Sequence, residues 1–320
     1  MDPQTKPVIL SCITHTLKSE EREFFAGFKP FGFILFARNI LDPVQLKKLC
    51  KDLRDSVGWH CPILIDQEGG RVRRMRPPHW PDYPSMKEIG DLDDKDRLIN
   101  TIRGISDDLN GVGIDVDCAP VLDVLFEQTH AAIGDRAFSH DPDIVGALAG
   151  LACETFINEG ITPVIKHMPG QGRAAKDSHY DLPVVSANLD DLENMDFRPF
   201  RHIIKQPYAH KVWGMVSHII YTAVDAEHPA SVSSKMTDLI RNELNFQGLL
   251  VSDDLCMNAL CTYGSPADRV AKTLEAGLDI ALYCAGHRDE MEEIAKACPP
   301  LREDSLKRFD ASSLRRRTAD

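Results

Sequence analysis

The sequence predicts one α/β domain with the TIM-barrel, (β/α)8, fold. Apolar runs rich in valine, isoleucine and leucine alternate with amphipathic stretches, and eight such runs fall within the 320 residues. A barrel of this kind typically takes about 250 residues. The runs are nearly continuous rather than alternating, as parallel strands covered on both faces should be. A doubly wound open sheet is the alternative, but no GxGxxG follows the first run.

The expected strands are short and apolar, as is typical of a parallel barrel. Each of them covers four to six residues, and from the second run onward each is separated from the next by a helix-like stretch. In chain order they are Val8–Ile13, Phe33–Phe36, Pro62–Ile65, Gly113–Val116, Thr162–Ile165, Val212–Ser217, Leu249–Ser252 and Asp279–Tyr283.

The amphipathic stretches between these runs should form the outer helices. Asp42-Pro43 and Ser233 are suitable helix starts, because a short polar side chain can cap the first turn and proline fits its first position. Gly111, Gly160 and Gly277 are expected to close helices before the next strand. The expected helices are Pro43–Val57, Lys95–Leu109, Pro142–Glu159, Leu189–Ile204, Ser233–Leu244 and Pro266–Ala276.

A single catalytic domain is expected to span residues 1–320. The sequence shows no linker, no low-complexity segment and no repeat beyond the strand–helix alternation. Leu314–Asp320, which contains three consecutive arginines, is expected to be a solvated tail. The default expectation for the oligomeric state is a monomer.

Composition narrows the class of partner and the compartment. The formal net charge of −12 disfavours a nucleic-acid or anionic-membrane binder, since both call for basic patches. No apolar run approaches the 18 residues of a membrane span, and the N-terminus lacks the pattern of a secretory signal. Nine cysteines without a CxxC pair suit reduced thiols, with Cys118, Cys153 and Cys284 in apolar surroundings. We therefore expect a cytoplasmic protein.

Polar clusters follow most of the expected strands. In a TIM barrel the active site lies at the carboxyl ends of the strands, so these clusters should face one mouth. After successive runs come Asp66-Gln67-Glu68-Gly69-Gly70-Arg71 with Arg73 and Arg74, then Asp115, Asp117, Asp123 and Asp135-Arg136, then Lys166-His167, Ser217-His218 and Asp253-Asp254.

The segment Lys166–Pro183, KHMPGQGRAAKDSHYDLP, combines a cationic pair with a glycine-rich turn and an Asp-Ser-His triplet. Two glycines and a proline exclude a helix there and permit a bent, mobile backbone. Asp177 can orient one imidazole nitrogen of His179 and leave the other free for proton transfer.

The residues alone leave several functions open. Glycoside hydrolysis needs a carboxylate nucleophile and a proton donor. Lys166 could instead form a Schiff base, or a metal could be held by His167, His179, His218 and an aspartate. A sugar-binding barrel without catalysis is the non-enzyme alternative. Structural roles are also open for some of these residues. Asp115, Asp117 and Asp123 could pair with arginines or cap turns, and His218 could be a buried histidine whose hydrogen bonds are made within the core.

Several segments together resemble a known family. They read IDQEGGRVRRM, KHMPGQGRAAKDSHYDLP, the stretch from MVSHIIY to GLLVSDDL, and AGLDIAL. In this order they resemble glycoside hydrolase family 3, and most closely its single-domain cytosolic bacterial β-N-acetylglucosaminidases of the NagZ type. The resemblance runs from about Val8 to Ala285. The combination of motifs is specific, whereas any one of them alone is weak.

The resemblance implies a retaining exo-hydrolase that removes terminal β-linked N-acetylglucosamine from peptidoglycan fragments, the anhydro-muropeptides, during cell-wall recycling. It implies Asp253 as the nucleophile and His179, paired with Asp177, as the acid/base. It implies no metal and no organic cofactor, since side chains supply each step of a double displacement. The residues that match sugar-gripping positions are Asp66, Arg74, Arg136, Lys166 and His167.

Two positions depart from the family's usual pattern, and one choice depends on the resemblance alone. Gln171 stands where the family has histidine, and Met168 where it has phenylalanine, which puts the packing of the loop in question. If a regular strand continued through Asp253 and Asp254, only one of them could face the sugar. Periodicity does not choose between them, and the resemblance chooses Asp253.

Overall fold

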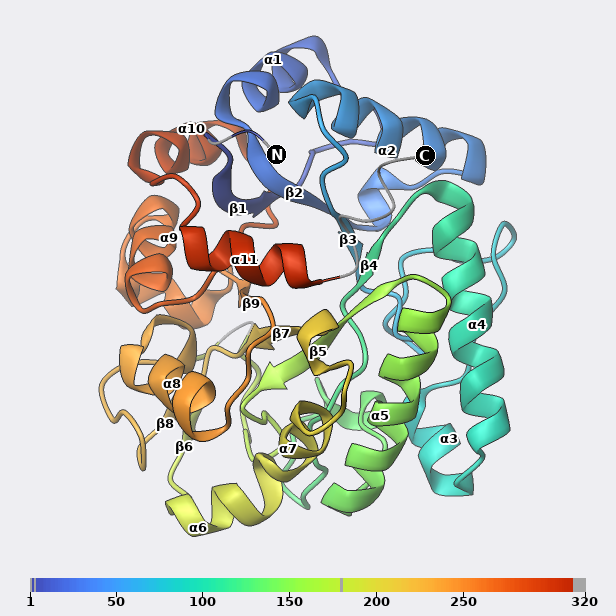
Figure 1. Ribbon diagram of the computed structural model, residues 1–320, viewed down its shortest axis with the longest axis vertical. Helices are drawn as coiled ribbons and strands as arrows, with labels where there is room; N and C mark the ends of the chain where they lie inside the picture. The colour runs from blue at the N-terminus through green and yellow to red at the C-terminus, as the bar shows by residue number, and fades with distance from the viewer. Residues whose placement is uncertain (1, 3, 179–180, 313–320) are drawn as a thin grey trace.

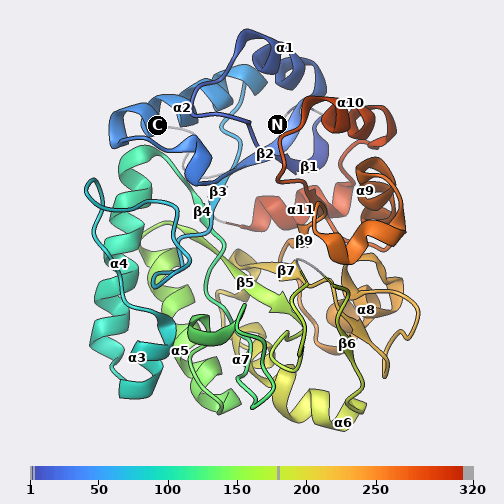
Figure 2. The same ribbon diagram turned by 180° about the vertical axis from the view of Figure 1, so that it is seen from behind.

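The computed structural model describes residues 2, 4–178 and 181–312. Within them, eight parallel strands close into a barrel in the order β1-β10-β9-β7-β5-β4-β3-β2 (Figures 1 and 2). The predicted TIM barrel is confirmed. Its strands are β1 (Lys6–Leu10), β2 (Pro30–Leu35), β3 (Ile63–Ile65), β4 (Val116–Asp117), β5 (Thr162–Met168), β7 (Trp213–Val216), β9 (Leu250–Asp254) and β10 (Ile280–Leu282).

Helices surround the barrel, and a short parallel pair, β6 (Val184–Val185) with β8 (Ile220–Tyr221), lies outside it. No helix within the described residues is both long and apolar enough to cross a membrane. The helices are α1 (Ser19–Phe28), α2 (Pro43–Val57), α3 (Met86–Leu92), α4 (Lys95–Val112), α5 (Pro142–Asn158), α6 (Leu189–Asp191), α7 (Arg198–Ile204), α8 (Ser234–Asp238), α9 (Pro266–Glu275), α10 (Arg288–Ala297) and α11 (Glu303–Ala311).

Every predicted strand contributes to the barrel, but several boundaries differ, most clearly that of the fourth strand. The strand expected at Gly113–Val116 begins only at Val116, and α4 continues through Gly111. Gly113 closes that helix instead, with a left-handed φ of 85° that glycine tolerates without strain. The helix start at Asp42 is as predicted, since its side chain accepts a hydrogen bond from the backbone N–H of Gln45.

Two predicted helices are not continuous. The helix expected over Leu189–Ile204 is divided into α6, a π-helical turn η3 (Leu192–Asp196) and α7. Pro199 explains part of the break, because proline has no N–H to donate to the preceding turn. Likewise α8 passes into a π-helical turn, η6 (Leu239–Glu243). The helices α1, α3, α10 and α11 were not predicted.

The interior of the barrel is filled with apolar side chains at the amino ends of its strands. Trp213 and Phe31 are fully buried there, and Phe309 of α11 packs against them with ring centroids 6.4 and 5.0 Å away. Figure 1 shows α11 lying across this end of the barrel. The C-terminal helix therefore closes one end, and a ligand has to enter at the other.

Seven of the nine cysteines are buried, whereas Cys256 is partly buried and Cys261 is exposed. All nine lie within the described residues and none forms a disulfide. Burial raises the pKa of Cys12 and of Cys50 to about 12. These thiols are therefore protonated members of the core, in agreement with the prediction from their surroundings.

Candidate active site

A cavity of about 420 Å³ opens where the strands β2, β3, β5, β9 and β10 end. It gathers the predicted site residues from separate strand ends and loops. His179 lies outside the described residues, so its position is not part of this account. The predicted residues that line the cavity are Asp66, Arg74, Arg136, Lys166, His167, Asp177 and Asp253.

Two β-bulges place pairs of adjacent residues on the cavity wall. Ile165 of β5 pairs with Gly214 and Met168 with Val216, so three steps along β5 match two along β7. The extra residue breaks the alternation of side chains, and both Lys166 and His167 face the cavity. The sequence-based boundary at Ile165 was wrong, because β5 continues to Met168.

The same irregularity occurs in β9. Val251 pairs with Ile280 and Asp254 with Leu282, again three steps against two. Both Asp253 and Asp254 therefore line the cavity. The expectation that strand alternation would turn one of them away was wrong, because the bulge removes the alternation at this point.

The two adjacent carboxylates differ in their partners. Oδ1 of Asp254 accepts hydrogen bonds from the backbone N–H groups of Cys256 and Cys284, at 3.0 and 3.2 Å. Burial raises the pKa of Asp254, although these bonds act against it. Asp253 accepts the N–H of Asp254 at 2.8 Å and lines the cavity. Asp254 thus ties the ends of β9 and β10 together.

A buried ion cluster lies at the same cavity. Nζ of Lys166 lies 2.8 Å from Asp66 and 2.6 Å from Glu68, and Arg74 lies 3.0 Å from the second oxygen of Asp66. Arg136 binds Glu68 through two parallel hydrogen bonds of 2.8 and 2.9 Å. Glu68 was seen in the sequence within the DQEGG segment but was not singled out. Glu68 joins Lys166 to Arg136.

The charges of this cluster are mutually stabilised. Burial acts to raise the pKa of Asp66 and of Glu68, but the adjacent cations outweigh it. The pKa of Asp66 falls well below its usual range, and that of Glu68 falls to about 2. Conversely, burial acts to lower the pKa of Lys166, and the two carboxylates raise it above its usual value. All three groups are therefore charged at neutral pH.

This arrangement contradicts the Schiff-base alternative. A lysine nucleophile must be deprotonated, which requires a pKa lowered by burial or by neighbouring cations. Lys166 has instead a raised pKa, and its ammonium group is held by two carboxylates. The lysine here stabilises charge rather than attacking a carbonyl carbon.

The three aspartates that follow the fourth apolar run have different roles. Asp115 lies at the amino end of β4, where it pairs with Arg54 and with His60. Asp117 is fully buried beneath the cavity, and burial raises its pKa well above the usual value. Both fit the structural reading. Asp123 instead contacts the site, because its Oδ2 lies 2.7 Å from Nδ1 of His167.

His218 is satisfied by the protein itself. Its Nδ1 lies 2.7 Å from the hydroxyl of Ser231 and its Nε2 lies 2.9 Å from the backbone oxygen of Asp254. Burial lowers its pKa, so the ring is neutral. With both nitrogens occupied, His218 is the core histidine of the structural reading and not a metal ligand. No group of three metal-ligating side chains is found among the described residues.

The glycine-rich loop is held firmly over its first half. The backbone N–H of Gln171 donates to Asp123 at 2.6 Å, and the hydroxyl of Tyr221 donates to the carbonyl of Gly170 at 2.8 Å. Gly172 packs so closely on the carbonyl of Val124 that any side chain would collide with it. These glycines serve close packing. Movement of the Pro169–His179 loop stays a prediction.

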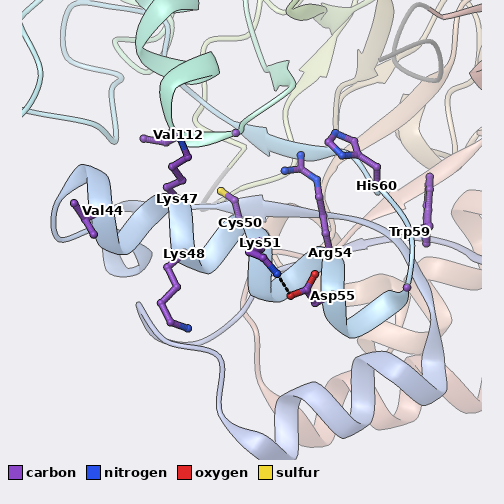
Figure 3. Close-up of a pocket in the computed structure, with 12 residues that line it drawn as sticks. Val44, Lys47, Lys48, Cys50, Lys51, Arg54, Asp55, Trp59, His60 and Val112 are labelled. Atoms are coloured by element: carbon purple, nitrogen blue, oxygen red, sulfur yellow. Dashed lines mark hydrogen bonds and ion pairs between the residues drawn. The ribbon is translucent and has the colours of Figure 1, made fainter. Parts of the chain in front are cut away.

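A second hollow lies away from these residues. It has a volume of about 1030 Å³ and includes Arg54 and His60, which pair with Asp115 at the amino ends of the strands. Figure 3 shows its basic side chains along α2, with Lys51 bound to Asp55. Lys48 and Lys51 pair with Asp52 and Asp55 along α2, and Arg54 pairs with Asp115, so these three cations have partners within the protein.

The fold and the cavity together define the class of protein. A TIM barrel carries its active site at the carboxyl ends of the strands, and this cavity offers carboxylates, cationic donors and an imidazole. Such groups suit a ligand rich in hydroxyl groups. The chain is a barrel enzyme of the glycoside hydrolase class.

It belongs to glycoside hydrolase family 3. The family profile described as the glycosyl hydrolase family 3 N terminal domain matches residues 6–315. A curated relative, the beta-hexosaminidase of Nitrosomonas eutropha, is 37% identical over 285 residues, which cover 87% of this chain and 80% of the relative. The recognition made from the sequence motifs is confirmed.

Solved structures agree with this assignment. NagZ from Neisseria gonorrhoeae, in complex with N-trifluoroacetyl-D-glucosamine, has a TM-score of 0.86 at 30% identity, covering 96% of this chain and 90% of that chain. A glycoside hydrolase family 3 beta-N-acetylglucosaminidase from a Paenibacillus strain has a TM-score of 0.88 at 27% identity. That match covers 98% of this chain and 61% of the Paenibacillus chain, so this chain spans less than two thirds of its length.

Proposed function

We propose that this protein is a retaining exo-β-N-acetylglucosaminidase. It removes terminal N-acetylglucosamine from peptidoglycan fragments of the anhydro-muropeptide type, and it does so in the cytoplasm during cell-wall recycling. The observation that carries the proposal is that Asp253 lines the same cavity as Asp66, Lys166 and Arg136 of the ion cluster. The identity of the sugar is inferred from the relatives, which are named beta-hexosaminidase and beta-N-acetylglucosaminidase.

The ion cluster supports the binding of a sugar. Asp66 uses one carboxylate oxygen for Lys166 and the other for Arg74, and each oxygen keeps a lone pair for a hydroxyl group. These partners hold Asp66 ionised and in place. Asp66 is therefore already oriented when the substrate binds, and little free energy is spent on ordering its side chain. Arg74, Arg136, Lys166 and His167 supply the remaining polar contacts in this proposal.

The reaction follows a double displacement. A carboxylate oxygen of Asp253 attacks the anomeric carbon, and the bond to the leaving oxygen breaks as that oxygen takes a proton from His179. A water molecule, deprotonated by His179, then attacks the same carbon and releases Asp253. Asp177, which lines the cavity, orients the imidazole and stabilises its charged form.

Turnover of two aryl glycosides tests the proposal. The purified protein should hydrolyse an aryl β-N-acetylglucosaminide with a much higher kcat/KM than the matching aryl β-glucoside, and proton NMR should show that the β-anomer is released first. Equal rates for the two substrates would contradict the sugar preference. The α-anomer as first product would contradict the retaining mechanism, and no turnover of either would favour a binding barrel.

A second measurement addresses the natural substrate. An N-acetylglucosaminyl-anhydro-muramyl peptide should lose free N-acetylglucosamine and leave the anhydro-muramyl peptide intact, as followed by mass spectrometry. If the aryl glycoside is turned over and the muropeptide is not, the assignment to cell-wall recycling is wrong while the activity itself stands.

A further inference from the structure

Asp123 lies beneath the cavity and uses its two oxygens for different purposes. Oδ1 accepts two backbone hydrogen bonds, from the N–H of His167 at 3.2 Å and from that of Gln171 at 2.6 Å. Oδ2 lies 2.7 Å from Nδ1 of the His167 ring. The side chain is completely buried, so no water competes for these contacts. The carboxylate thus joins the end of β5 to the start of the glycine-rich loop.

The contact to Oδ2 fixes the tautomer of His167. A carboxylate oxygen can only accept, so Nδ1 must carry the proton and donate it. In the neutral ring Nε2 is then left as an acceptor. The surroundings agree, because the guanidinium NH2 of Arg136, which can only donate, lies 3.4 Å from Nε2.

We infer that Asp123 is a positioning residue that presents His167 to the substrate as a hydrogen-bond acceptor. His167 is mostly buried, and it lines the cavity beside Lys166 and Arg136. Those two neighbours are donors, so Nε2 of His167 is the acceptor for a sugar hydroxyl that donates on this side of the site. Because Nε2 has one lone pair, that hydroxyl takes the place of the long 3.4 Å contact to Arg136. The inference rests on the proposed sugar-binding function of the cavity. It assigns a role to Asp123, for which the sequence left both a structural and a functional interpretation open.

The geometry makes Asp123→Asn a selective test. The side-chain oxygen of asparagine should stay with the two backbone N–H groups, so its NH2 group takes the position that faces Nδ1 of His167. An NH2 group can only donate, so Nδ1 has to become the acceptor and the proton moves to Nε2. The shape of the site is kept while the acceptor becomes a donor that opposes Arg136.

The tautomer can be observed directly and without substrate. Long-range ¹H–¹⁵N NMR of histidine-labelled protein, recorded in the alkaline range where imidazoles are neutral, should show His167 protonated on Nδ1. Its signals are identified by their loss in His167→Gln. In Asp123→Asn the proton should be on Nε2. A wild-type ring protonated on Nε2, or an unchanged tautomer in Asp123→Asn, would overturn the inference, and the first test needs no Asp123 variant to fold.

Kinetics then separate positioning from a general loss of structure. Asp123→Asn should lower kcat/KM for the aryl N-acetylglucosaminide by about 10- to 100-fold, because the N–H at Nε2 of His167 then faces the donor Arg136 in a buried site. In a His167→Gln background, Asp123→Asn should lower kcat/KM by less than about threefold, because Asp123 acts through His167. An equal loss in both backgrounds would contradict the role through His167.

Asp115→Asn serves as the matched control. It is the same substitution at a buried aspartate at the amino end of β4, where Asp115 pairs with Arg54 and His60. It should leave the His167 tautomer and kcat/KM near the wild-type values even if stability falls. Should the wild type fail to hydrolyse the substrate, the proposed function is wrong, whereas the tautomer measurement still decides the inference about Asp123.

Discussion

At the scale of single residues, the site depends on charges that compensate one another. Lys166 is only 2% exposed, and its ammonium group is the shared partner of Asp66 and Glu68. Removing one member of a buried ion cluster leaves buried charge that is no longer fully compensated. The resulting loss of stability is much larger than the net contribution of a buried ion pair to the free energy of unfolding. The free energy of unfolding should therefore respond strongly to Lys166.

Lys166→Met should lower the free energy of unfolding by roughly 3–5 kcal/mol, because two buried carboxylates lose the cation that they share. Urea or guanidinium unfolding measures the change. Lys48→Met provides the control, since Lys48 is 73% exposed and its pair with Asp52 should contribute less than about 1 kcal/mol. Equal effects of the two substitutions would contradict the buried cluster.

Which residues meet in the cavity was predictable from the sequence, but how they pair was not. Each of Asp66, Lys166 and Asp253 follows an apolar run, and barrel topology brings such positions to one end. The sequence does not show that Asp123 reaches the ring of His167, 44 residues further along the chain. Nor does it show that Glu68 joins Lys166 to Arg136. Both contacts depend on three-dimensional register that no local pattern encodes.

At the scale of secondary-structure elements, departures from regular geometry adapt the barrel to its function. The bulges in β5 and β9 each turn two adjacent polar residues toward the cavity. Strand periodicity alone predicts that such neighbours point apart, which is why the sequence reading assigned Asp253 and Asp254 to opposite faces. A bulge inserts a residue without a characteristic sequence signature at these positions, so it escaped the prediction.

The π-helical turn η3 ends at Asp196, which anchors the glycine-rich loop. Asp196 lies 2.6 Å from Nε of Arg173, and its Oδ1 has no hydrogen-bond partner within the described residues. Burial raises its pKa to about 6, although Arg173 acts in the opposite direction. Because the folded protein binds this proton more tightly than the unfolded chain, the contribution of Asp196 to stability increases as the pH falls from about 6 to 3.8.

Asp196→Asn should remove that pH dependence. The difference in unfolding free energy between wild type and variant should change by up to about 3 kcal/mol across this window, with the wild type gaining relative stability toward the acidic side. Above pH 6 the difference should be constant. Urea unfolding at a series of pH values measures it, and parallel curves for the two proteins would show that the Asp196 carboxyl titrates normally.

At the scale of the whole molecule, stability and chemistry lie at opposite ends of the barrel. Phe309 is 2% exposed and packs with Phe31, Trp59 and Trp213 at the amino ends of the strands. The cavity with Asp253 opens at the carboxyl ends. This division is typical of TIM barrels, in which the loops after the strands carry function and the opposite face carries stability.

Phe309→Ala should lower the free energy of unfolding by about 3–5 kcal/mol, because a large ring is lost from a packed interior. Chemical denaturation measures this loss. In the folded protein kcat/KM should stay near the wild-type value. Leu92→Ala is the control, since Leu92 is 63% exposed and its loss should change stability by less than about 0.5 kcal/mol. A fall in kcat/KM at native conditions would contradict the separation of the two ends.

The barrel itself was predictable because eight apolar runs of strand length alternate with amphipathic stretches, a pattern that few other folds share. The closing helix α11 was not predicted. Its sequence, EDSLKRFDA, buries only Ser305 and Phe309, so its apolar pattern is too sparse to stand out from the polar end of the chain. Only the packing of Phe309 on the barrel gives this helix its function.

The central claim is that Asp253 forms a covalent bond with the sugar, and trapping the intermediate tests it most directly. A slow fluorinated N-acetylglucosaminide with an activated leaving group should leave one sugar on the protein. Digestion and tandem mass spectrometry should locate the adduct on Asp253, and Asp253→Ala should form none. An adduct on Asp254 or on Lys166, or turnover without any adduct in burst-phase measurements, would contradict the account.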